Sequence, residues 1–572
     1  MSKRVLLFFA VLSAGMMGLP GFVLAATSSQ IQQGVTQTDM SRQLRESPLI
    51  EEQKNAEVHV KKVKTLPQAQ GPSLKVREIV LEGNTIFTTP QLRRYVKSAE
   101  GHDLFLKDLQ GVANLITAHY QMAGYISARA YIPPQKIKDG RVVIRIVEGR
   151  VGYIILKGNH WFADRLYLQR ITLQQGQFLN LQQLSMSVQD INQLPDRSLK
   201  VYIEPGVVAG TSDITITAHD QNPVHASYEY NTNGSQLTHI SRDLFHITDN
   251  NLTGHGDTLQ TTFSMTEQNE LLGGVLQYVF PVPLQGLTYS FNAGGAYSRL
   301  GKDLRPFKVT ADSYFVSPQV TKNFIKEPGF KLDGFLDFEI KDAKTMVDNQ
   351  RLSYDRDRVL DLGPRVSIDD AMGKTFLAGD MRGGIPDFLG GSELHDPSAS
   401  RYDSGGQFIY WTGSVDRINR LPFGNALVLH GGGQYSPMAL TSLEQFYLGG
   451  MNSVRGYAQD DSSGDSGLNF SAEVRTPLYF IPSDWHVGAS KDKTWRDALS
   501  FVTFVDGGRV FNYYRQNVAA PLDRTLLSAG VGLRFYLTPD MNCQAGIGFP
   551  FGDAPNSGNK HDQIYVMARV GF

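Results

Sequence analysis

A single arginine lies between glycines in a polar stretch of this chain, Gly449-Gly450-Met451-Asn452-Ser453-Val454-Arg455-Gly456-Tyr457. A guanidinium group can bind a carboxylate through two parallel hydrogen bonds, and a neighbouring glycine lets the backbone turn tightly. The chemistry that this stretch offers is therefore ion pairing rather than catalysis. The candidate partner is Asp506, in the segment Phe504-Val505-Asp506-Gly507-Gly508.

Two nearby motifs suggest other chemistry, and neither holds the residues that this chemistry needs. Gly464-Asp465-Ser466-Gly467 matches the sequence around a chymotrypsin-type nucleophile, but a nucleophile needs an oriented base and none can be placed beside Ser466. Asp460, Asp461 and Asp465 lack the regular ligand spacing of a calcium loop. The run from Asp460 to Gly467 is too polar for a packed core and predicts a long loop. We expect no catalytic residue, no cofactor and no metal ion.

The composition bounds the class of protein. The chain has 572 residues, a formal charge of -1 and 19% charged residues, which argues against a nucleic-acid partner. Cys543 is the single cysteine, so no intramolecular disulfide can form. Lys3 and Arg4 precede an apolar stretch that ends at Val23-Leu24-Ala25, which is the layout of a signal peptide over residues 1-25. We therefore expect an exported protein.

From residue 220 to residue 572 apolar and polar side chains alternate without a helical period. Several alternating runs reach about ten residues, the length that a tilted strand needs to cross a bilayer, whereas a soluble sandwich needs only about five or six. The last run ends in an aromatic residue, and one of its faces carries Ile564, Val566, Val570 and Phe572. The pattern predicts a transmembrane β-barrel over residues 220-572, closed by this terminal strand.

Asp506 belongs to one of these strands. It shares parity with Ser500 and is out of phase with Leu499, Phe501 and Val505, so it faces the lumen if those three face lipid. A loop arginine folded into the lumen could then pair with Asp506. Spacing alone equally allows two separate, hydrated pore residues.

An internal repeat precedes the barrel. The segment Ile79-Val80-Leu81-Glu82-Gly83-Asn84-Thr85-Ile86-Phe87 returns as Ile154-Ile155-Leu156-Lys157-Gly158-Asn159-His160-Trp161-Phe162. Each copy predicts a strand, two helices and two further strands, in the order β-α-α-β-β. We expect two small α+β domains, over residues 73-149 and 150-219, with sheet edges that can accept another strand.

The segment before the repeat is polar. Residues 26-72 predict one isolated helix, between Ser28 and Leu44, and a flexible linker that contains Pro67, Gly71 and Pro72. A lone helix of this kind must dock on something or stay disordered.

Taken together, these features resemble the two-partner secretion transporters, the TpsB proteins of the haemolysin and filamentous-haemagglutinin exporter type within the outer-membrane insertase superfamily. The resemblance covers essentially the whole mature chain. It implies a mostly β fold with two periplasmic POTRA domains, a 16-stranded barrel, an N-terminal helix that plugs the pore, and a sixth extracellular loop folded inward. The resemblance also implies that the loop arginine, Arg455, pairs with the barrel-wall aspartate, Asp506. The residues of this loop-to-wall motif are Val454, Arg455, Gly456, Tyr457, Asp506, Gly507 and Gly508.

The resemblance also implies a function. It predicts an outer-membrane pore of a Gram-negative bacterium that recognises a large β-rich partner protein through its POTRA domains and moves it to the cell surface without ATP. The alternative is an assembly factor that inserts other β-barrels, although such factors resemble longer arrays of POTRA domains. We expect outer-membrane lipids and the barrel-assembly machinery as further partners, and a monomer. The exported passenger is left open among a haemolysin, an adhesin, a haem-acquisition protein and a contact-dependent toxin.

Overall fold

The chain divides into two compact units, one within Glu52–Pro223 and one that contains Val224–Phe572. The expected signal peptide and the expected helix between Ser28 and Leu44 lie outside the described residues. The computed structural model describes residues 57–60, 73–235, 238–282, 285–401, 403–488, 493–513, 523–538, 540–555 and 563–572.

The first module of the N-terminal unit has the expected order β-α-α-β-β. Its three-stranded sheet has the order β3-β6-β5, with β3 parallel and β5 antiparallel to β6. The second helix buries Leu109, Ala113, Ile116 and Tyr120 on one face. The elements are β3 (Glu78–Glu82), α4 (Thr89–Val96), α5 (Leu106–Met122), β5 (Arg129–Tyr131) and β6 (Arg141–Val147), with a small ribbon of β2 (Leu74–Lys75) and β4 (Asp103–Leu104).

The second module repeats this order. Asn180 caps its longer helix by accepting a hydrogen bond from the Gln183 N–H. The elements are β7 (Arg150–Lys157), α6 (Asp164–Leu168), α7 (Leu181–Asn192), β8 (Arg197–Pro205) and β9 (Thr211–Asp220). None of the helices in the described part of the chain is both long and apolar enough to span a membrane.

The second sheet has a fourth strand that the sequence analysis missed. β1 (Glu57–Val60) lies within residues 26–72, where only a helix and a linker were expected, and it pairs in parallel with β8, giving the order β1-β8-β9-β7. The His59 ring stacks on the Tyr202 ring with centroids 5.1 Å apart. Because β1 covers the β8 edge, the β7 strand forms the other edge of this sheet.

The repeated Gly-Asn turns are closed by the same contacts in both modules. Asn84 Nδ2 donates to the Phe87 carbonyl at 2.9 Å, and Asn159 Nδ2 donates to the Phe162 carbonyl at 2.9 Å. This shared contact explains why both residues recur at one spacing in the two copies.

A carboxylate from the end of the last strand completes each turn. Asp220 accepts from the N–H of His160 at 2.9 Å in the second module. In the first module Glu148 accepts from the N–H of Thr85 at 2.7 Å and of Ile86 at 2.8 Å. The two carboxylates have the same role, but a comparison of the two copies by residue type does not detect it, because one copy uses Glu and the other Asp.

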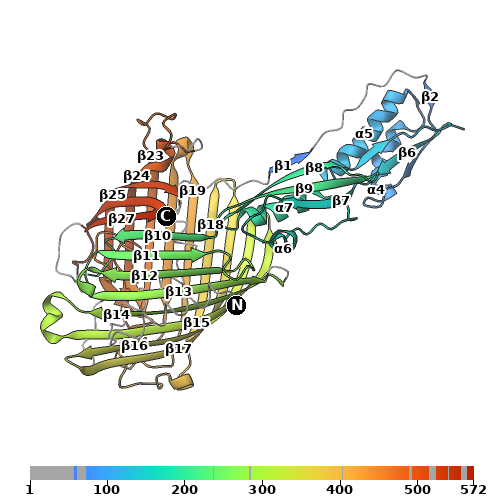
Figure 1. The fold of residues 1–572 in the computed structure, drawn as a ribbon. Coiled ribbons are helices and arrows are strands. Elements are labelled where there is room, and N and C mark those ends of the chain that lie inside the picture. The colour runs from blue at the N-terminus through green and yellow to red at the C-terminus, as the bar shows by residue number, and fades with distance from the viewer. Residues whose placement is uncertain are drawn as a thin grey trace. The chain divides into compact units, whose positions relative to one another are not determined.

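The second unit is a closed barrel of sixteen antiparallel strands (Figure 1). The fold class is therefore confirmed. Its strands are β10 (Val224–Asn231), β11 (Arg242–Asp249), β12 (Thr258–Thr266), β13 (Leu271–Val282), β14 (Leu287–Arg299), β15 (Val309–Glu327), β16 (Phe330–Val347), β17 (Gln350–Asp370), β18 (Gly373–Gly384), β19 (Ile409–Arg420), β20 (Ala426–Tyr435), β23 (Ser466–Pro477), β24 (Leu499–Phe511), β25 (Arg524–Thr538), β26 (Met541–Pro550) and β27 (Gln563–Gly571).

The two faces of the wall follow the period-two pattern. On β24, Phe501 and Val505 are 38% and 46% exposed on the outer face, whereas Asp506 is fully buried on the inner face. The barrel closes where the last strand pairs with the first, with Tyr228 opposite Val570. Inside this seam Arg569 Nε donates to Glu229 Oε2 at 3.0 Å. Closure leaves no unpaired strand edge toward lipid.

The turn carboxylate Glu148 gives a first prediction. Burial raises the pKa of Glu148, but hydrogen bonds from Thr85, Tyr120 and Ile86 outweigh burial and hold the pKa below its usual value. A depressed pKa contributes stability that is present above the pKa of the unfolded chain and is lost as the pH falls through the lower folded value. E148Q should therefore cost about 1 kcal/mol at pH 7 and less at pH 3, where protonation of Glu148 weakens the cap. Thermal unfolding of residues 52–223 at both pH values measures this difference.

The control is E82Q, which changes an exposed glutamate of β3 that pairs with Arg145 at the surface. An equal loss of stability in E148Q at both pH values would contradict the assignment of Glu148 as an ionised cap.

Candidate functional site

The connection between β20 and β23 folds into the barrel. We name residues 436–465 loop 6; its stem is a short hairpin of β21 (Phe446–Leu448) and β22 (Ser462–Gly464). The prediction that the run from Asp460 to Gly467 lies outside any packed core is wrong, because Asp465 is 1% exposed. It is bound by Arg401 from the loop before β19. A polar segment can be buried here because the barrel interior supplies charged partners.

The structure places the Arg455 guanidinium on Asp506. Arg455 Nε donates to Asp506 Oδ2 at 2.7 Å, Nη2 donates to Oδ1 at 2.9 Å, and the Arg455 backbone N–H donates to the same carboxylate at 3.1 Å. The guanidinium carbon lies 3.6 Å from the centre of the Phe504 ring. The arrangement is bidentate and stacked, which lysine could not reproduce.

A second carboxylate completes this site, and the sequence analysis missed it. Glu473 Oε2 lies 2.5 Å from Arg455 Nη1. Glu473 is on β23, whose register sets Ser471 opposite Asp506 on β24, so Glu473 and Ser471 lie two residues apart on the same inner face. The sequence pattern identifies inward-facing acidic residues as candidate partners of Arg455. Only the strand register shows which of them lies close to Arg455.

The residues beside Arg455 lock the loop tip in place. Gly456 has φ +103°, and a Cβ at this position would lie 3.0 Å from the Ser528 Cβ, so both backbone conformation and space require glycine. Tyr457 and Val454 are fully buried in one apolar cluster. The Gly552 N–H donates to the Tyr457 hydroxyl at 3.1 Å.

The two glycines after Asp506 lie on opposite faces of β24. A Cβ on Gly508 would lie 2.8 Å from the Leu448 side chain of the loop stem, so the missing side chain lets loop 6 lie against the wall. A Cβ on Gly507 would lie 2.5 Å from the Phe470 ring. Gly508 therefore faces loop 6, whereas Gly507 faces a side chain of the neighbouring strand β23.

The terminal strand contributes to the same site from its inner face. Ile564, Val570 and Phe572 are 67%, 46% and 86% exposed on the outside of β27, and Val566 shares their parity. Tyr565 points inward and its hydroxyl donates to the Tyr457 carbonyl at 3.1 Å. The strand that closes the barrel therefore also holds the loop tip.

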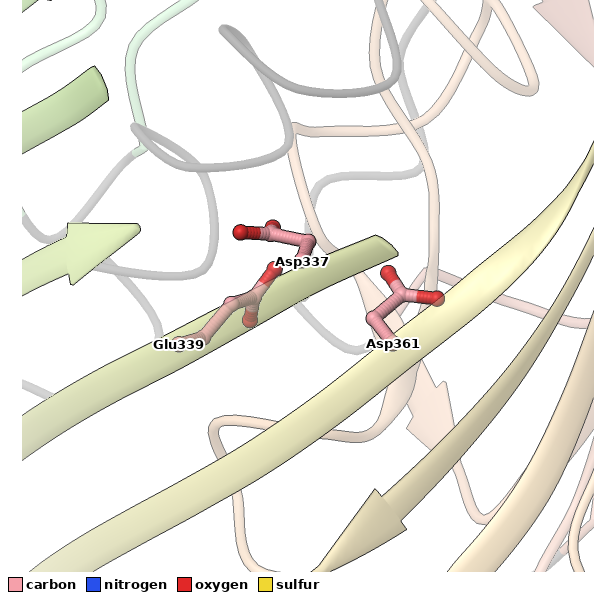
Figure 2. Close-up of side chains that lie close together, drawn as sticks. All are labelled: Asp337, Glu339 and Asp361. Carbon is pink, nitrogen blue, oxygen red and sulfur yellow. The ribbon is translucent and has the colours of Figure 1, made fainter. Parts of the chain in front are cut away.

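Three carboxylates further along the wall lie close enough to suggest a metal site. Asp337 and Glu339 on β16 and Asp361 on β17 each offer an oxygen within 4.8 Å of the others (Figure 2). However, both Asp337 oxygens accept from Ser317, and Arg382 lies 2.5 Å from Glu339. These groups fit a wall network of compensated charges better than a cation site.

Comparisons with known proteins agree with this architecture. The family model described as haemolysin secretion/activation protein ShlB/FhaC/HecB matches residues 210–535, and the POTRA domain of ShlB type matches residues 74–149. The heme/hemopexin transporter protein HuxB of Haemophilus influenzae is 22% identical over 86% of both chains. The outer membrane transporter CdiB of Dickeya dadantii is 22% identical over 93% of both chains. The solved structure of CdiB from Escherichia coli is 21% identical, with a TM-score of 0.69 over 96% of this chain and 98% of that chain.

A sixteen-stranded barrel with POTRA modules and an inward-folded loop defines an outer-membrane protein transporter whose modules lie in the periplasm. The chain belongs to the ShlB/FhaC/HecB family of haemolysin secretion/activation proteins, because that family model covers more than half of it. It is a transporter of two-partner secretion, which works with a secreted partner protein through its POTRA domains. Secretion pores are not a class of enzymes. The family membership favours export over the assembly-factor alternative.

The ion pair at the loop tip gives a second prediction. R455A and D506A should reach the outer membrane at near-normal levels, because the closed ladder does not depend on them, and both should secrete poorly. Loss of one partner from a shielded pair costs about 3 to 5 kcal/mol, falling toward about 1 kcal/mol in a hydrated lumen. The double variant should be no worse than either single variant. Quantitative secretion assays on all three measure the coupling.

S528A is the control, since it replaces an uncharged luminal residue near Gly456 and leaves the ion pair intact. Additive defects in the double variant would show that Arg455 and Asp506 act separately.

Proposed function

We propose that this chain exports one large β-rich partner protein and that loop 6 must move for the passenger to pass. The single observation that carries this proposal is the position of loop 6, whose tip lies inside the barrel with Tyr457 fully buried and Arg455 paired to two wall carboxylates. Folding of the passenger outside the cell would prevent its return and so supply direction without ATP. The chain itself performs no chemical step in this scheme.

Passenger recognition is assigned to the second module. Its sheet carries exposed apolar side chains on the face opposite the helices, where Tyr153, Ile155 and Tyr202 are 55%, 50% and 41% exposed. Ile155 and Tyr202 both flank Thr215 in the register, so they lie in one row across the sheet. The start of the β7 edge is bonded to Gly176 and Gln177 through Val151, so the edge available to a partner begins after Val151, beside the apolar row. An incoming strand there gains main-chain hydrogen bonds and apolar contacts together.

The structure of the barrel also supports proposals about its lipid contacts, its oligomeric state and its assembly. Its outer face presents apolar side chains such as Phe501 and Val505 to outer-membrane lipids. A closed barrel without an exposed strand edge has no need of a second copy, so we propose a monomer that the barrel-assembly machinery inserts. No sheet edge of the barrel is left for strand exchange between copies.

The binding prediction uses the exposed row of the second module. Y153K and I155K should weaken binding of the passenger's N-terminal domain to residues 52–223 by about tenfold or more, because each places a charge in an apolar contact. The candidate passenger for this test is a large exported protein encoded beside this chain's gene, and titration calorimetry measures the affinity. E82K, on the first module, is the matched control. Unchanged affinity in both β7 variants would move the recognition site elsewhere.

A further prediction concerns residues 28–44, the helix expected to plug the pore. A polar helix before the modules has no other evident place to dock, and a wide barrel leaks when nothing fills it. Deletion of residues 28–44 should raise the conductance of the full-length protein in planar bilayers. Deletion of residues 64–72, an equally polar linker stretch, is the control; unchanged conductance in the 28–44 deletion would mean that the pore is closed by other groups.

A further inference from the structure

The limb of loop 6 that leads to its buried tip makes its own ionic contact with the barrel wall. Glu444 is 2% exposed. Its Oε1 lies 2.7 Å from Nζ of Lys341 on β16, and its Oε2 accepts from the hydroxyl of Tyr410 on β19 at 2.6 Å. We propose that Glu444 is a second anchor, which holds loop 6 in the lumen independently of Arg455.

Neighbouring residues fasten the same limb. The Thr441 hydroxyl donates to Asp357 Oδ2 on β17 at 2.5 Å. Leu440 packs in a small apolar cluster with residues of β17 and β19, and Leu443 packs against Ala343 on β16. Residues 440–444 are therefore attached to three wall strands by ionic, hydrogen-bonded and apolar contacts.

The cations of the wall near Glu444 also pair with carboxylates of the wall itself. Lys341 Nζ lies 2.5 Å from Glu339 Oε2, and Arg382 lies 2.5 Å from Glu339 and 3.2 Å from Asp361. Both cations consequently stay paired when Glu444 is removed. This makes Glu444 a suitable position for substitution, since its loss removes the ionic contact of this limb and leaves no unpaired charge on the wall.

The two anchors use different strands. Arg455 is held by β23 and β24, whereas Glu444 is held by β16 and β19, with Arg382 of β18 3.7 Å from its carboxylate. Along the loop, β21 lies between these two attachments and β22 follows Arg455. Release of the tip alone therefore leaves residues 440–444 on the wall. Clearing the lumen of loop 6 requires both contacts to break.

Thiol labelling of the full-length protein in whole cells separates the two anchors. In a C543S background, L443C reports the Glu444 anchor and V454C reports the tip, because Leu443 and Val454 are 5% and 0% exposed. E444A should raise the rate of maleimide labelling at L443C by about tenfold or more and leave V454C unchanged. R455A should do the reverse, and the double variant should expose both thiols. Labelling reports the position of loop 6, so the test of the Glu444 anchor is valid whether or not a passenger is exported.

The matched control is E393A, which removes an exposed carboxylate from the loop before β19 and should change neither rate. Y410F, which deletes one hydrogen bond to Glu444 and keeps the ring, serves as a second variant if E444A fails to assemble, and it should raise L443C labelling by a smaller factor. Unchanged labelling at L443C in E444A and Y410F would overturn the proposal. Exposure of both thiols by R455A alone would show a single anchor and would overturn it as well.

Discussion

Closure of the strand ladder is the constraint on which the rest of this structure depends. A bilayer offers no water to backbone N–H and C=O groups, so every wall strand must pair on both sides and β27 must meet β10. The alternation of side chains then has a fixed consequence: apolar residues such as Val505 face outward and polar residues such as Asp506 face inward. The interior becomes a polar, enclosed space whose charges have to find partners within it.

Loop 6 is stable inside this space because wall residues of opposite charge pair with its charged side chains. Arg455 brings one cation to Asp506 and Glu473, while Glu444 brings one carboxylate to Lys341. A shielded charge is costly when its partner is lost, so each contact makes the inward position of the loop strongly preferred. In the proposed mechanism the same property makes the loop a barrier to transport, and the passenger supplies the interactions that replace these contacts.

The N-terminal modules present a different physical problem. A three-stranded sheet with helices on one face leaves strand edges and one face in contact with water. In the second module β1 covers one edge, and the β7 edge lies beside the exposed side chains of Tyr153 and Ile155. Edge and apolar face together form a surface suited to an extended segment of the secreted partner, so recognition needs few specific side chains.

The sequence by itself determined the features that depend on local pattern. Period-two alternation established the barrel, the Gly-Asn repeat established two modules, and the parity of Asp506 predicted that it faces the lumen. Tertiary structure alone decided which charges meet: Glu473 depends on the register of β23 against β24, and Glu444 on where loop 6 folds back. It also buried Asp465 and added β1 to a sheet. The physical reason is that acids are common on inward faces, and only the relative placement of distant strands brings one of them within hydrogen-bond distance of a given cation.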